Sequence, residues 1–134
     1  MEHPARNPSS FSRLTMKMDE QAFKQRTQKL ALQIMELVEA LPKSRSADVI
    51  GRQLLRCGTS IGANYRSACR GKSIADVLAK LAIVEEEADE TIYWLELLIA
   101  AKIVRANDIE ILIKESDEIV AMTVASIKTL RTRK

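Results

Sequence analysis

Apolar residues recur at intervals of three and four through most of the chain, which is the spacing of one face of an α-helix. Three short polar stretches interrupt this pattern and divide it into four segments. Short connections favour antiparallel neighbours, so we expect an all-α fold, an antiparallel up-down-up-down four-helix bundle. The expected helices cover residues 20–41, 47–71, 74–103 and 108–130.

The two ends of the chain fall outside the periodic pattern. Residues 1–18 contain two prolines and three serines and no helical period, so we expect a flexible N-terminal tail. Residues 19–130 then form one bundle domain, and residues 131–134 form a basic C-terminal tail that suits the negative end of the last helix.

Local signals mark the predicted helix ends. Ser46 is a candidate N-cap for the second helix, and Gly71 suits its C-terminal cap. Ser73 and Asp76 have the spacing of a capping box at the start of the third helix, and Asn107 is a candidate N-cap for the fourth.

The third predicted helix carries the most regular apolar seam, with positions that step four, three, four, three. A second stripe flanks this seam and widens the apolar face. The seam comprises Ile74, Leu78, Leu81, Glu85, Ala88, Ile92, Leu95 and Ile99, and the second stripe comprises Val77, Val84, Thr91 and Leu98.

The segment RQLLRCGTSIGANYRSACRGKS, residues 52–73, resolves into three sectors of the second helix when residues are placed ~100° apart. One sector faces the core, and a second is a flank of three glycines. Each glycine inside a helix costs about 1 kcal/mol relative to alanine, so three on one flank suggest that another backbone approaches closely there. The core sector comprises Ile50, Leu54, Cys57, Ile61, Asn64 and Ala68, and the glycine flank comprises Gly51, Gly58 and Gly62.

Some apolar and glycine positions are candidates for an oligomer interface. A tryptophan and two aliphatic residues of the third helix point away from both of its stripes, and a small monomer rarely leaves such a surface exposed. Self-association is the economical explanation. The candidate interface residues are Ile83, Trp94, Leu97, Gly58 and Gly62.

The third sector of the second helix is a ribbon of arginines, and two interpretations of it stay open. Guanidinium groups spaced along one face suit phosphates, and without interleaved aromatics the contact would be to the nucleic-acid backbone. Alternatively, the ribbon pairs with the acidic run EEEADE, residues 85–90. The candidate nucleic-acid-binding residues are Arg52, Arg56, Arg66, Arg70 and Lys72.

Asn64 and Glu85 occupy predicted core positions of the second and third helices. An unpaired polar group there would cost several kcal/mol, so we expect two buried polar residues that satisfy each other or a backbone group. A catalytic Glu85 is the alternative, but the sequence places no second acid, histidine or nucleophile beside it.

Composition narrows the function classes. Hydrophobic residues make up 46% of 134 residues, enough for one core, and the net charge of +3 permits an anionic partner without demanding one. We expect a cytoplasmic protein, because no run approaches the ~20 apolar residues of a membrane span and no secretory leader is present. Cys57 and Cys69 are expected to be reduced, since one continuous helix places them ~18 Å apart.

Familiar catalytic and metal patterns are missing from the sequence. The one histidine, His3, lies in the tail, which excludes the usual di-iron bundle site, and two cysteines without histidine make no zinc pattern. No phosphate-binding loop or nucleophile elbow occurs. We therefore expect no enzyme, no metal and no cofactor, while a metal-dependent hydrolase using Glu85 and Glu86 is the enzyme-class alternative.

Three blocks resemble the four-helix-bundle family of 23S rRNA intervening-sequence proteins: the LP at Leu41, QLLRCGTSIGANYRSACRGKS, and KLAIVEEEADETIYWLELL. The resemblance covers residues 23–104 and implies a left-handed bundle that assembles as a ring, most often a homopentamer, in bacteria. It also implies contexts in ribosomal RNA insertions or as accessory subunits of retroelement reverse transcriptases. Many members carry an acidic-glycine pair where this chain has the more basic YRSACRGKS.

The leading hypothesis is a non-enzymatic, homo-oligomeric bundle that binds RNA, DNA or a nucleic-acid enzyme through its arginine face. The alternative is a structural protein-interaction module whose arginines form salt bridges between subunits.

Overall fold

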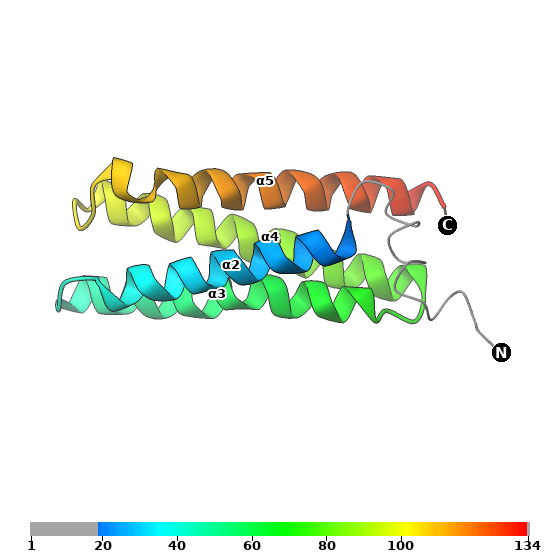
Figure 1. Ribbon diagram of the computed structural model, residues 1–134, viewed down its shortest axis with the longest axis horizontal. Coiled ribbons are helices and arrows are strands. Elements are labelled where there is room, and N and C mark those ends of the chain that lie inside the picture. Colours follow the sequence, from blue (N-terminus) through cyan, green and yellow to red (C-terminus); the bar gives the residue numbers. More distant parts are fainter. Residues whose placement is uncertain (1–18, 134) are drawn as a thin grey trace.

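The computed structural model describes residues 19–133, which form four helices. Figure 1 shows these helices side by side along one long axis. Every regular element in this range is helical, and consecutive helices run in opposite directions (Figure 1). The predicted four-helix bundle is confirmed, whereas the predicted N-terminal tail lies outside the described residues. The helices are α2 (Glu20–Glu39), α3 (Arg45–Cys69), α4 (Ile74–Ala100) and α5 (Ala106–Arg131).

Side chains that accept hydrogen bonds from free backbone amides set three of the helix starts, those of α2, α3 and α4. Asp19 Oδ1 accepts from the amide of Gln21 at 3.0 Å at the start of α2. Ser73 Oγ accepts from the amide of Asp76 at 3.1 Å at the start of α4, as the sequence predicts. Both caps replace hydrogen bonds that the first helical turn cannot make internally.

Two helices begin two residues earlier than predicted. α3 is capped by Ser44, whose hydroxyl accepts from the amide of Ala47, and Ser46 lies inside the helix. Ala47 is buried, so core packing favours the earlier serine. α5 follows Arg105, which makes no side-chain capping hydrogen bond, and Asn107 lies inside that helix.

The buried face of α4 lies between the two stripes that the sequence suggests. Its core takes every member of the second stripe and only alternate members of the seam, because α4 packs against both α3 and α5. The seam residues on the flank, Glu85 among them, are half-buried. The buried residues are Val77, Leu81, Val84, Ala88, Thr91, Leu95 and Leu98.

On α3 the core sector agrees with the prediction except at one position. Tyr65 is fully buried, while Asn64 is half-buried on the flank. The Tyr65 ring packs edge-to-face on Phe23 of α2, with ring centroids 4.5 Å apart. The large aromatic surface that this pair buries selects the tyrosine over the neighbouring asparagine.

The four helices do not contact one another equally. α3 and α4 share the largest contact, followed by α4 with α5 and α2 with α3, whereas α2 and α5 touch only sparsely. α2 is therefore anchored mainly to α3, and the outer surface along the α2–α3 pair carries the cationic residues described next.

Candidate functional site

The arginine ribbon lies on the outer surface of α3, but its members differ in what they contact. All four arginines are exposed, but Arg56 is turned toward α4. Arg52 pairs with Asp48 of its own helix at 2.7 Å, and both side chains are more than half exposed. Solvent screens such a pair strongly, so Arg52 stays accessible to an outside partner.

Arg56 ties α3 to α4. Its guanidinium contacts Glu87 Oε1 at 3.2 Å and also Glu90, whose Oε2 accepts a hydrogen bond from Trp94 Nε1 at 2.9 Å. Burial lowers the pKa of Arg56, but the charges of Glu90 and Glu87 raise it by more, so the net shift is upward. Arg56 thus forms the predicted salt bridges to the acidic run, and forms them within one chain.

The C-terminal half of the ribbon is free of such pairing. Neither Arg66 nor Arg70 forms an ion pair with any residue in the described range, and Lys72 is exposed beside them. Arg66 and Arg70 line a hollow of about 400 Å³ that also includes Asp76. The Asp76 carboxylate accepts from the backbone amide of Lys72 at 3.1 Å, so it serves the helix start rather than either arginine.

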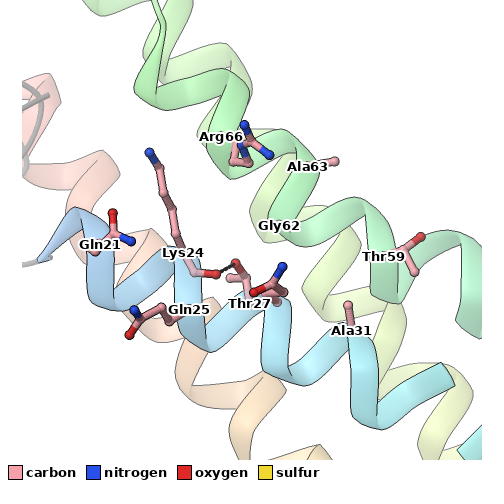
Figure 2. Close-up of a pocket in the computed structure, with 10 residues that line it drawn as sticks. Gln21, Lys24, Gln25, Thr27, Ala31, Thr59, Gly62, Ala63 and Arg66 are labelled. Carbon is pink, nitrogen blue, oxygen red and sulfur yellow. Dashed lines mark hydrogen bonds between the residues drawn. The ribbon is translucent and has the colours of Figure 1, made fainter. Parts of the chain in front are cut away.

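A second and adjoining hollow is a groove lined by residues of both α2 and α3. Its volume is about 440 Å³, and it shares Ala63 and Arg66 with the first. Figure 2 shows Lys24 from α2 and Arg66 from α3 on facing walls of this groove. The two hollows therefore place cationic side chains along one continuous stretch of the molecular surface.

The glycine flank is an internal contact, which corrects the assignment of Gly58 and Gly62 to an oligomer interface. A Cβ on Gly58 would lie 2.6 Å from Ile34 Cδ1, and one on Gly62 would lie 3.1 Å from Thr27 Oγ1. Both neighbours belong to α2. Glycine leaves room for the close packing of α2 on α3 at these positions. The nearest atoms at Gly58 are side-chain atoms of Ile34, so the expected approach of another backbone is met only at Gly62, where the carbonyl carbon of Thr27 would lie 3.7 Å from the added Cβ.

Asn64 and Glu85 are half-buried, which corrects their assignment to the core. Asn64 Nδ2 donates to the Ser60 carbonyl at 2.9 Å and to Ser60 Oγ at 2.8 Å, so its amide is satisfied on its own helix. Glu85 forms no ion pair within residues 19–133. The two residues do not satisfy each other.

The predicted apolar interface residues Ile83, Trp94 and Leu97 are half-buried, and the last two pack against the core. Tyr93, which was not among the predicted residues, is 55% exposed and packs edge-to-face on Trp94 with ring centroids 4.9 Å apart. Its place beside Trp94 on the outer sector of the same helix was the available signal.

Both cysteines are free thiols of α3. Burial raises the pKa of Cys57, and burial raises that of Cys69 to about 11. Thr91 Oγ1 donates to the Cys57 sulfur at 3.2 Å. Protonated, shielded thiols of this kind are poor nucleophiles.

Metal ligands do not gather in the described part of the chain, where no three His, Cys, Asp or Glu residues are grouped for an ion. Glu85 and Glu86, the residues of the hydrolase alternative, are half-buried and exposed respectively. Among the described helices, none has the length and apolar character of a membrane span.

Comparison with known proteins places this chain in a family. The model of the 23S rRNA-intervening sequence protein family matches residues 19–125. A crystal structure from Bacteroides thetaiotaomicron VPI-5482, of a protein of unknown function from the S23 ribosomal protein family, is similar with a TM-score of 0.77 and 38% sequence identity. The likeness covers 83% of this chain and 99% of that one, and no curated protein matches. The chain belongs to the family of 23S rRNA-intervening sequence proteins.

Proposed function

We propose that this chain is a non-enzymatic, homo-oligomeric bundle protein of the cytoplasm that binds RNA through phosphate contacts from the outer face of α3. The observation that carries the proposal is the pair Arg66 and Arg70, both exposed and without an ion-pair partner in the described range. An arginine that is not already neutralised can bind a phosphate without first breaking a salt bridge.

The charge distribution supports an anionic partner on this face. α4 contains seven acidic residues and one lysine, whereas the segment from Arg45 to Lys72 contains six basic residues and one aspartate. The modest total charge thus conceals two oppositely charged helices. A phosphate chain would be attracted to α3 and repelled by the outer face of α4.

RNA is preferred over DNA as the polymer because of the family context. The family description refers to an intervening sequence of 23S rRNA, and the Bacteroides relative is described as belonging to an S23 ribosomal protein family. These words apply to the relatives, and they make RNA the first polymer to test here.

The test compares two charge-matched double variants. Arg66→Ala with Arg70→Ala should weaken binding of a single-stranded RNA and reduce the slope of log affinity against log salt by about 1.4, the loss of two phosphate contacts at ~0.7 each. Lys114→Ala with Lys128→Ala removes two exposed cations of α5 and should leave the slope nearly unchanged. Equal losses in both variants would show a response to net charge and contradict the assigned face.

A second candidate function is a structural self-assembly module, and a different observation supports it. Glu86, Asp89 and Glu96 are exposed on α4 and form no ion pair in the described range, so they suit Arg66 and Arg70 of another copy. Reversing Glu86 and Asp89 to lysine should then reduce the oligomer mass in sedimentation, whose wild-type value tests the expected pentamer. Adding Arg66→Glu and Arg70→Glu to the same protein should restore the oligomer mass.

A further inference from the structure

The groove between α2 and α3 has polar walls and a floor of small residues. Gly62 and Ala63 of α3 and Ala31 of α2 line it, and Thr27 closes it from below. Thr27 Oγ1 donates to the carbonyl of Lys24 at 3.0 Å, which holds this threonine against its own helix. The absence of bulk at these positions leaves a volume of about 440 Å³, within the usual range of small-ligand sites.

Cations from both walls face this groove, and no acidic residue lines it. Arg66 stands on the α3 wall without an ion-pair partner among residues 19–133, and Lys24 stands opposite on α2 (Figure 2). Lys24 Nζ contacts Glu20 Oε2 at 3.2 Å, which positions the ammonium at one end of the groove. An anionic group between these two side chains would gain a charge-assisted contact from the unpaired Arg66, and a second one from the Lys24 ammonium, which it would share with Glu20.

Three glutamines add uncharged hydrogen-bond donors and acceptors to the α2 wall. Gln21, Gln25 and Gln28 line the groove, and none of their side-chain amides bonds to another residue in the described range. A glutamine amide offers a donor and an acceptor together, which is the pattern that reads the edge of a nucleobase. A simple anion such as sulfate would leave these amides unused.

We propose that the α2–α3 groove binds one unpaired nucleotide unit, with its phosphate between Arg66 and Lys24 and its base edge against the glutamines of α2. This inference rests on the proposed function when the nucleotide belongs to an RNA strand, and it stands alone when the ligand is a free nucleotide. It adds a base-reading pocket to a surface that otherwise contacts only the backbone.

The test fills the groove without removing charge. Ala63 is exposed, and leucine is nearly as good a helix former as alanine, so Ala63→Leu should fold normally and occupy the groove. Ala121→Leu, at an exposed site on α5, is the matched control. The probes are twelve-nucleotide homopolymers of A, C and U measured by fluorescence anisotropy, and the corresponding nucleoside monophosphates measured by NMR titration.

We expect Ala63→Leu to lower affinity for the preferred homopolymer about fivefold or more, the scale of one good base contact, while the salt slope is kept. Gln25→Leu with Gln28→Leu should reduce the difference among the homopolymers, and Ala121→Leu should match the wild type. RNA binding that is unaffected by Ala63→Leu and by the glutamine changes would overturn the groove and leave the proposed function standing. If the wild-type protein binds nucleotides but not RNA, the proposed function alone is overturned. If the wild-type protein binds neither, both the proposed function and the nucleotide site in the groove are overturned.

Discussion

Arg26 and Glu115 join α2 to α5 through a bidentate pair, in which Arg26 Nε and Nη2 contact the two carboxylate oxygens at 2.9 and 2.7 Å. Glu118 accepts a further bond from Arg26 Nη2 at 2.8 Å. The hydrogen bond that Arg26 donates to Glu115 raises the pKa of Arg26, although burial opposes the shift. This ion pair joins two helices that otherwise contact each other only sparsely.

The Arg26–Glu115 pair should stabilise the α2–α5 contact measurably. Because both side chains remain a quarter to a third exposed, we expect a coupling energy of about 1 kcal/mol from a double-mutant cycle of Arg26→Ala and Glu115→Gln in urea unfolding. The same cycle on Arg52 and Asp48, an exposed pair within one helix, should give a coupling near zero. Equal coupling in the two cycles would contradict the role assigned to Arg26.

Gly58 and Ile34 should behave as one packing unit. Gly58→Ala places a Cβ 2.6 Å from Ile34 Cδ1, and overpacking of this kind costs about 1 to 3 kcal/mol, more than the gain in helix propensity. Ile34→Val removes the clashing methyl group, so the double variant should be more stable than the sum of the single effects by at least about 0.5 kcal/mol. Urea unfolding measures this difference. Gly51→Ala combined with Ile34→Val serves as the control and should be additive, because Gly51 faces Val38 and Leu41.

Arg56 should report on structure and Arg66 on binding. Arg56→Ala removes the link to Glu87 and Glu90, so it should lower the free energy of unfolding by about 0.5 to 1 kcal/mol and alter the emission of Trp94, the one tryptophan. Arg66→Ala should leave stability and emission unchanged and weaken RNA binding. Emission spectra, urea unfolding and anisotropy on the same samples separate the two roles, and a reversed pattern would refute them.

Alkaline pH should destabilise the fold through Cys69. Its folded pKa is about 11, against an ordinary value of 9.0, because burial disfavours the thiolate. Between these values the unfolded chain releases a proton that the folded chain keeps, so stability falls as pH rises across that window. Cys69→Ala should make the urea midpoint less dependent on pH in the same window, although Tyr65, whose pKa burial also raises, retains part of the effect. An identical pH dependence in both proteins would contradict this assignment.

Local chemistry and periodicity were enough to predict the four helices, their order and most of the core of α3. Ile50, Leu54, Cys57 and Ile61 are buried as the spacing indicates, because a helix that packs on one side must repeat its apolar residues at the helical period. The outer position of the arginines follows from the same geometry. Ser73 also caps α4 as predicted, since a cap depends only on residues within one turn.

Which of two adjacent residues is buried depended on contacts with the neighbouring helices. Tyr65 displaced Asn64 from the core because Phe23 of α2 supplies a ring to pack against, and the α4 core lies between its two stripes because two helices share that face. The glycine flank faces α2 because Ile34 and Thr27 approach it there. Which arginines are free was likewise beyond the periodic pattern, since Arg56 meets Glu87 and Glu90 only when α3 and α4 lie antiparallel in this register. A helical period specifies a face, whereas side-chain contacts between helices specify which residue of that face is buried, paired or left accessible.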